Sequence, residues 1–231
     1  MKKNIYSLLA LCLLVTQVMA QTDKNRTLTT RVADLLAQVP AENAAKLDKN
    51  MAELAELGKP GLVQIASMLT PPGKGDNSKI QYALGGFTYA ASASGKEAWR
   101  KIAAQAYGEA LSKVTDPDNK VFLIYQLQTV GKDESVDVLK SYLTDEKLAG
   151  PASRALARIA SPASGAALLQ ALSGATGSQQ IAITEALGES KYKEAAPAIE
   201  KTAASTEYPV ASSQPEIAIG RSRCISPAPF T

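Results

Sequence analysis

Apolar residues recur along most of this chain at the spacing that places them on one face of an α-helix. The first run, between residues 28 and 39, has apolar side chains at positions i, i+4, i+7, i+8 and i+11, and Pro40 ends it. Further runs with helical spacing continue as far as Ser205. No segment shows the strict alternation of a half-buried β-strand. The pattern therefore predicts an all-α fold, with an N-terminal helix or cap over residues 21–42.

A two-helix unit recurs between Asn43 and Ser205 with a period of about 30 residues. Each copy consists of an apolar helix end, a tight turn rich in Gly, Pro, Ser or Ala, and a second apolar helix. One such pair cannot bury its apolar face alone, and stacked neighbours complete the core. We therefore expect about five stacked antiparallel helix pairs. The clearest copies lie at residues 54–65, 127–139, 156–168 and 186–199.

Short local signals predict where several helices begin and end. Asp116–Pro117 and Ser161–Pro162 each place an N-cap side chain before a proline at the first helical position. The sequence Gly-Lys-Pro-Gly at residues 58–61 predicts a turn between two helices. The Pro- and Gly-rich stretch 70–77 predicts a flexible loop.

The last helix pair and the segment after it differ in character. In the pair, we expect Ile181, Ile183 and Leu187 to pack against residues 197–199. In the segment that follows, prolines and a glycine recur too often for a regular helix. We therefore predict an irregular tail over residues 206–231. Two interpretations remain open: the tail covers an apolar flank of the last pair, or the chain is a truncated or frame-shifted product of a longer protein.

The turn phrase from Gly131 to Leu139 and the stretch from Ala186 to Ile199 resemble HEAT repeats, most closely the short bacterial subtype called HEAT-like or PBS-lyase-like. The resemblance covers residues 43–205. It implies a right-handed α-solenoid, armadillo-like in its helical packing, whose concave face binds other molecules. Most turns lack the Asp-Pro common in the family, and Ser161–Pro162 comes nearest to it.

The first 20 residues have the pattern of a secretory signal peptide. Lys2 and Lys3 form a positive start, residues 5–15 are apolar, and residues 18–20 end on small side chains. The apolar stretch is shorter than the roughly 20 residues of a membrane span, although an uncleaved N-terminal anchor is the alternative. We expect cleavage after Ala20, export to the periplasm or the extracellular space, and no stable insertion in the membrane.

The signal peptide and the Gln21 that follows it resemble those of exported proteins of Gram-negative bacteria, notably Bacteroidetes. In such bacteria, similar helical arrays precede a sugar-processing domain related to 3-keto-disaccharide hydrolases. That resemblance implies an alternative function: the chain is the N-terminal helical module of a larger, truncated envelope protein, and carbohydrate is then a partner only through the missing domain.

The residues that most enzymes and metal sites need are scarce. The chain has 0 histidines, which excludes Ser-His-Asp and Cys-His sites and histidine-containing zinc sites. It has 2 cysteines, and only Cys224 would remain after signal cleavage, because Cys12 lies in the signal peptide. The acidic pairs at residues 133–134 and 145–146 lie beside turns, where acids favour helix N-termini. We therefore expect no enzyme activity, no cofactor and no metal.

The charges argue against two classes of partner. Removing Lys2 and Lys3 leaves 23 basic and 22 acidic residues, a net charge of +1. A nucleic-acid-binding protein would show a basic stripe, because phosphate neutralisation supplies most of its affinity. The charges here are interspersed instead, so we expect neither nucleic acid nor a charged membrane surface as a partner.

The remaining candidate chemistry is that of a binding surface. Most aromatic residues in the middle of the array are expected to fill the core, and Trp99 is the expected exception because Lys96, Arg100 and Lys101 flank it. The second helix of each pair should line the concave face. The candidate partner-binding residues are therefore Gln64, Ser67, Trp99, Arg100, Gln105, Lys140, Gln170 and Glu200.

These observations lead to one expected function. We expect an exported, non-enzymatic helical-repeat scaffold that binds a protein or peptide partner, or positions a neighbouring domain, along its concave face.

Overall fold

The computed structural model describes residues 26–205 of the chain. Within this range the fold is all-helical and has no β-strand, which confirms the predicted all-α class. The expected signal peptide, the tail and both cysteines lie outside the described residues. The elements are α2 (Leu28–Ala37), α3 (Ala44–Ala66), α4 (Ser78–Ala91), α5 (Glu97–Lys113), α6 (Pro117–Val130), the 3₁₀ helix η1 (Asp133–Ser135), α7 (Val136–Lys140), α8 (Ala149–Ile159), α9 (Pro162–Leu172), α10 (Gly177–Ser190), the 3₁₀ helix η2 (Lys193–Ala195) and α11 (Ala196–Ser205).

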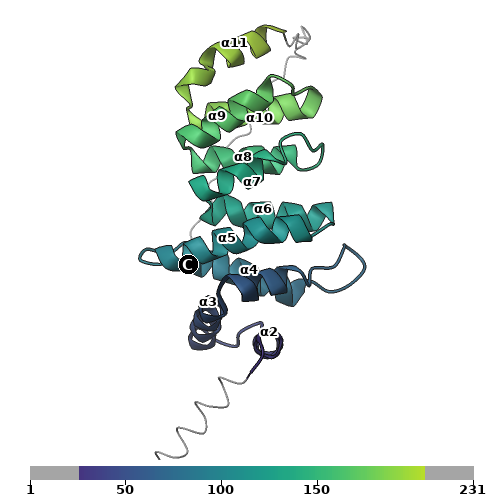
Figure 1. Cartoon of the computed structure of the whole chain (residues 1–231), viewed down its shortest axis with the longest axis vertical. Coiled ribbons are helices and arrows are strands. Elements are labelled where there is room, and N and C mark those ends of the chain that lie inside the picture. Colours follow the sequence, from purple (N-terminus) through teal and green to yellow (C-terminus); the bar gives the residue numbers. More distant parts are fainter. Residues whose placement is uncertain (1–25, 206–231) are drawn as a thin grey trace, which may run out of the picture.

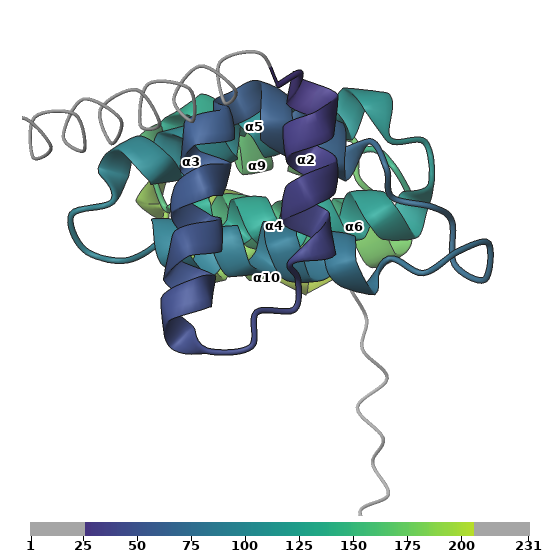
Figure 2. The same cartoon turned by 90° about the horizontal axis from the view of Figure 1, so that it is seen from below.

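The helices are stacked along one long axis, with α2 and α3 at one end and α11 at the other (Figure 1). Helices two apart in the sequence pack on one another: α4 on α6, α6 on α8, α8 on α10, and α3 on α5. Helices that follow one another also pack together, as α5 does with α6 and α9 with α10. Seen along the axis, α2 and α3 lie side by side across the first end of the stack (Figure 2).

One apolar core runs through the described stack, from Val32 in α2 to Ala195 in η2. Large side chains such as Leu54, Phe87 and Leu127 are completely buried in it. Many fully buried positions are alanines, whose small side chains let adjacent helices approach closely and also favour the helical backbone. These alanines include Ala83, Ala103, Ala106, Ala110, Ala152 and Ala155.

Both N-cap predictions are confirmed. The Asp116 side chain accepts a hydrogen bond of 2.9 Å from the backbone amide of Asn119, and Pro117 is the first residue of α6. Ser161 and Ser164 form a reciprocal capping box at the start of α9, with Pro162 at its first position. Each cap satisfies backbone amides that the first helical turn leaves without a partner.

The turn predicted at residues 58–61 corresponds to a kink at Gly58, where two helical segments of α3 meet. Gly58 has φ 62° and ψ −158°, which no residue of a regular α-helix adopts. Pro60 follows in the first turn after the kink, where its missing amide hydrogen removes no helical hydrogen bond. The helical pattern therefore resumes after a single non-helical residue.

The packing predicted for Ile181 is also wrong. Its side chain is 49% exposed, whereas Ile183 and Leu187 are buried as expected. Ile181 and Ile183 are two positions apart, so they point about 200° apart around the helix axis. Pro197, which was expected to face Ile181, is exposed as well. The spacing of apolar residues correctly predicted the helix α10, but Ile181 lies outside its buried stripe.

One acid of each pair beside the turns has a structural partner. Oδ1 of Asp145 accepts hydrogen bonds from the backbone amides of Lys147 and Leu148, at 2.9 and 3.0 Å, just before α8. Glu134 accepts a hydrogen bond of 2.5 Å from Nη1 of Arg100. No helix within residues 26–205 combines the length and the apolar character needed to cross a bilayer.

Candidate binding groove

An apolar groove of about 740 Å³ opens between the N-terminal half of α3, the C-terminal half of α4 and the start of α5. Its position follows from the packing of α3 on both α4 and α5. Two charged side chains, Asp48 and Lys96, stand among the lining residues. The apolar side chains that line the groove are Leu47, Met51, Ala52, Tyr89, Ala90, Ala93 and Trp99.

Tyr89 is the most exposed large apolar residue of this groove, with 81% of its surface accessible. Its neighbours in sequence, Phe87 and Thr88, are buried, so the register of α4 turns Tyr89 outward. The expectation that the aromatic residues of the middle helices fill the core is therefore wrong for Tyr89. An exposed tyrosine offers a flat apolar face and a polar hydroxyl, which together suit contact with a partner.

Trp99 is partly buried and already has two neighbours on its indole ring. The ring of Phe87 stacks against it with centroids 5.8 Å apart and planes inclined by 19°. The ammonium group of Lys96 lies 3.8 Å from the centroid of the Trp99 ring, a cation–π contact. Trp99 thus packs against the core at the groove wall, and it is less exposed than its flanking charges predicted.

Gly86 shapes the wall of the groove beside Met51. A Cβ atom at Gly86 would lie 3.4 Å from Sδ of Met51, at the limit of ordinary van der Waals contact. The flexible thioether side chain therefore lies close to α4. A methionine in such a wall adapts its shape to different apolar side chains.

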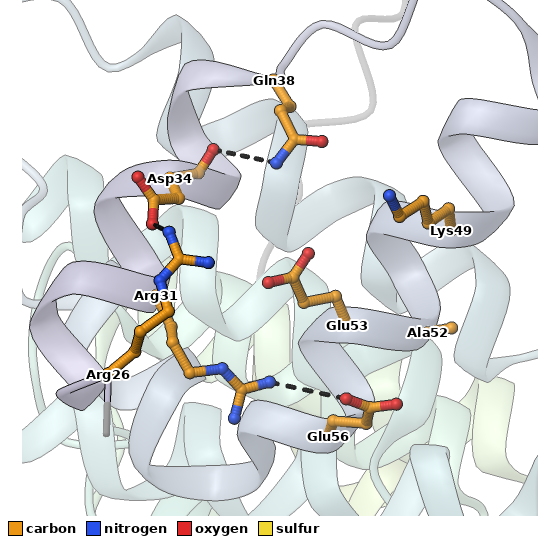
Figure 3. Close-up of a pocket in the computed structure, with 8 residues that line it drawn as sticks. All are labelled: Arg26, Arg31, Asp34, Gln38, Lys49, Ala52, Glu53 and Glu56. Atoms are coloured by element: carbon orange, nitrogen blue, oxygen red, sulfur yellow. Dashed lines mark hydrogen bonds and ion pairs between the residues drawn. The ribbon is translucent and has the colours of Figure 1, made fainter. Parts of the chain in front are cut away.

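A second, charged cleft of about 550 Å³ lies between α2 and α3 (Figure 3). Arg26 pairs with Asp34, and Nη2 of Arg31 lies 3.5 Å from a carboxylate oxygen of Glu56. Figure 3 shows the side chains of Lys49 and Glu53 extending from α3 into the space between the helices. Ala52 lines both this cleft and the apolar groove, so the two hollows adjoin across α3.

The structure places only Trp99, of the predicted partner-binding residues, in the groove. Gln64 donates a hydrogen bond to Thr29, and the Ser67 hydroxyl donates one to the carbonyl of Val63. These two side chains therefore act within the N-terminal helices. Gln105 and Glu200 are exposed on α5 and α11.

Lys140 and Gln170 are brought together by the packing of α7 on α9. Nζ of Lys140 donates a hydrogen bond of 2.6 Å to Oε1 of Gln170. Both side chains are exposed, so this contact links two neighbouring helices at the surface.

Arg100 connects α5 to the end of α6 and to η1. Its side chain is only 11% exposed and donates hydrogen bonds to Glu97, Glu134 and the carbonyl oxygen of Val130. Partial burial alone would lower the pKa of this guanidinium, but the hydrogen bonds to Glu134 and Glu97 outweigh it, and the pKa is raised. Arg100 is thus engaged in the fold.

Sequence reasoning missed Tyr89, Met51 and Asp48 as groove residues. The apolar spacing of α4 gave no signal for Tyr89, because helices of this chain also bury consecutive residues, as α8 does at Ala155, Leu156 and Ala157. Within residues 26–205, no group of three or more Asp, Glu, Cys or His side chains is arranged to hold a metal ion.

No protein-family model, curated protein or solved structure matches this chain. Inference about function therefore rests on the groove, the adjoining cleft and the sequence pattern.

Proposed function

We propose that this chain is an exported, non-enzymatic helical-repeat protein that binds a peptide segment of a partner protein in the groove between α3, α4 and α5. The helices would form a right-handed, HEAT-like α-solenoid of about five pairs. The 30-residue period and the packing of helices two apart along the stack support this arrangement. The expected signal peptide supports export.

The observation that carries the proposal is the exposure of Tyr89 at the edge of an apolar groove. The aromatic side chain there is 81% exposed. Large exposed apolar surface next to a concave wall is typical of sites that another molecule covers. Ala90 and Trp99, which are partly buried, continue that surface into the groove, and the buried Met51 also lines it.

The chemistry of the groove favours binding over catalysis. It contains no histidine or cysteine, and its only carboxylate is that of Asp48. General acid–base catalysis uses titratable groups that lie close to the substrate. The turn acids Asp145 and Glu134 do not line the groove, and both form hydrogen bonds elsewhere in the fold. Release of sugar from glycosides by the purified chain, lost on replacement of Asp48, would contradict this part of the proposal.

A display selection tests the binding function. Random dodecapeptides are selected on the immobilised chain, and enriched peptides are then measured against two variants. Ala93→Trp places an indole in the groove from an exposed position, whereas Ala166→Trp adds the same side chain to an exposed site on α9. We expect Ala93→Trp to weaken binding at least about tenfold and Ala166→Trp to leave it unchanged.

Two results would contradict the proposal. One is the absence of any enriched peptide. The other is a set of enriched peptides whose affinity for Ala93→Trp equals that for Ala166→Trp, because such peptides bind elsewhere. Circular dichroism melts of both variants show whether the fold is intact.

A further inference from the structure

We propose that residues 213–219 of this chain cover an open face of α10, formed by Ile181, Thr184 and Gly188. This face lies toward the other end of the stack from the groove between α3, α4 and α5, so the inference does not depend on the proposed peptide binding (Figure 1). Two observations lead to it. The helix α10 leaves open a face that the equivalent helix α8 buries, and residues 213–219 repeat the sequence with which α10 begins.

The helices α4, α6, α8 and α10 form a row in which each helix packs on the next. The helix α8 has a row neighbour on both sides, and residues around most of its surface are buried. Among residues 26–205, α10 has a row neighbour only on the α8 side, and its buried residues are Ile183, Ala186 and Leu187. The helix α10 therefore lacks a cover that the inner helices of the row receive.

The C-terminal caps of α8 and α10 align the two helices. Ala160 and Lys191 are the C-cap residues, and both have left-handed backbone angles, with φ 51° and 54°. When these caps are superposed in sequence, the buried Leu156 of α8 corresponds to the buried Leu187 of α10. Positions at which the burial of the two helices differs can then be compared directly.

One face of α8 is buried within the row. It consists of Gly150, Ser153 and Ala157, at positions i, i+3 and i+7, which share one face of an α-helix. Ser153 and Ala157 are buried, and Gly150 is half-buried. All three side chains are small, which permits the close approach of a neighbouring helix.

The equivalent face of α10 is open. Its residues are Ile181, Thr184 and Gly188, and Ile181 is 49% exposed. Gly188 is exposed as well, and no atom lies within 4 Å of a Cβ atom built there. This face thus combines an exposed isoleucine with a glycine that permits close approach. Among the described residues it has the surface of an inner helix without the neighbour.

Residues 213–219 have the sequence of such a neighbour. The chain reads Ser-Gln-Gln-Ile-Ala-Ile from Ser178 to Ile183, and Ser-Gln-Pro-Glu-Ile-Ala-Ile over residues 213–219, with one additional residue. Ile219 corresponds to Ile183, which is completely buried in a helix that packs on α8. Pro215 is compatible with the first turn of a helix, where a missing amide hydrogen removes no helical hydrogen bond.

The connecting chain is long enough for this contact. Residues 206–212 lie between the end of α11 and the repeated sequence, and they can span at most about 25 Å. The connection from α7 to the next helix of the row, α8, is of similar length and consists of residues 141–148. The repeated sequence can therefore reach α10 as α8 reaches α6.

A double-mutant cycle on the full chain tests the contact. Ile181→Ser is introduced into the unmodified chain and into a chain that carries Ile217→Ser and Ile219→Ser, and thermal unfolding is followed by circular dichroism. We expect Ile181→Ser to lower the midpoint by at least about 3 °C more in the unmodified chain, because the other chain has already lost the contact.

The matched control replaces two other apolar residues of the tail. A chain with Ile225→Ser and Phe230→Ser keeps the repeated sequence intact. In this chain Ile181→Ser should lower the midpoint by the same amount as in the unmodified chain.

Hydrogen exchange locates the covered face and needs no substitution in α10. The amides of residues 181–188 should exchange faster in the chain with Ile217→Ser and Ile219→Ser than in the unmodified chain or the control chain. The amides of α4 should exchange equally in all three. The protection of residues 181–188 should be independent of protein concentration, because the covering segment belongs to the same molecule.

Three results would overturn the inference. One is an equal effect of Ile181→Ser in all three chains. Another is exchange of residues 181–188 that is unaffected by the substitutions at positions 217 and 219, and this comparison decides if Ile181→Ser prevents folding. The third is protection that rises with protein concentration, which would assign the covering segment to a second copy of the chain.

Discussion

The side-chain amide of Asn119 donates a hydrogen bond of 2.9 Å to the backbone carbonyl oxygen of Thr70, 49 residues earlier in the chain. Asn77 forms three hydrogen bonds with the same residue. Its Nδ2 donates to the Thr70 carbonyl at 2.7 Å, and its Oδ1 accepts from the Thr70 amide at 2.9 Å and from the Thr70 hydroxyl at 3.1 Å. The two ends of the loop predicted over residues 70–77 are thereby fixed to each other and to the first turn of α6.

Asn119→Ala should destabilise the protein by about 1–2 kcal/mol, because the buried amide is lost and the Thr70 carbonyl keeps only Asn77 as a partner. The free energy of unfolding is measured by urea denaturation. Gln105→Ala, a change at an exposed position of α5, should alter it by less than about 0.5 kcal/mol. A loss for Asn119→Ala no greater than for Gln105→Ala would show that the loop is not held by this contact.

The helices and their beginnings could be predicted because their causes are local. The spacing of apolar residues determines which face of a helix is buried, and it places Leu139 and Leu156 in the core as expected. An N-cap such as Asp116 needs only the next three residues to form its hydrogen bond. These interactions are present in any arrangement of the helices.

The groove could not be predicted, because its walls come from residues far apart in sequence. Met51, Tyr89 and Trp99 meet only when α3 packs on α4 and α5. Arg100 seemed free for a partner on local grounds, but the tertiary fold supplies Glu134 and the Val130 carbonyl, more than 25 residues later. Spacing within one helix contains no information about such partners.

The packing of α9 against the start of η2 makes a prediction about Gly165. A Cβ atom there would lie 2.4 Å from both Cγ and Cδ2 of Tyr192, at the rigid base of the ring. Gly165→Ala should therefore destabilise the protein by about 1–3 kcal/mol, because the side chain or the backbone must move. The measurement is the midpoint of thermal unfolding followed by circular dichroism.

The control for that prediction is a second glycine-to-alanine change of opposite expected sign. Gly188 lies near the end of α10, and no atom lies within 4 Å of a Cβ built there. Gly188→Ala should raise stability by up to about 1 kcal/mol, because alanine favours the helix. If Gly165→Ala were also stabilising, Tyr192 would not pack on α9 as the structure has it.

The ion pairs of Glu109 predict a pH dependence of stability. Its carboxylate accepts hydrogen bonds of 2.7 Å from Nζ of Lys113, one turn later, and from Nζ of Lys59 in α3. These contacts lower the pKa of Glu109 from 4.5 to about 2. Because the folded pKa is below the unfolded value, the stabilisation is complete above pH 4.5 and is lost as the pH falls toward 2.

Glu109→Gln should therefore unfold at a lower temperature than the unmodified chain at pH 7, and the difference should shrink below pH 4.5 and disappear near pH 2. The melting temperatures are measured at several pH values in this range at low salt. Because the carboxylate is exposed to solvent, high salt should reduce the difference at pH 7 as well. Glu185→Gln is the matched control, since Glu185 is exposed on α10. A difference for Glu109→Gln that stays constant from pH 7 to pH 2 would mean that the Lys59 and Lys113 contacts do not stabilise the folded carboxylate.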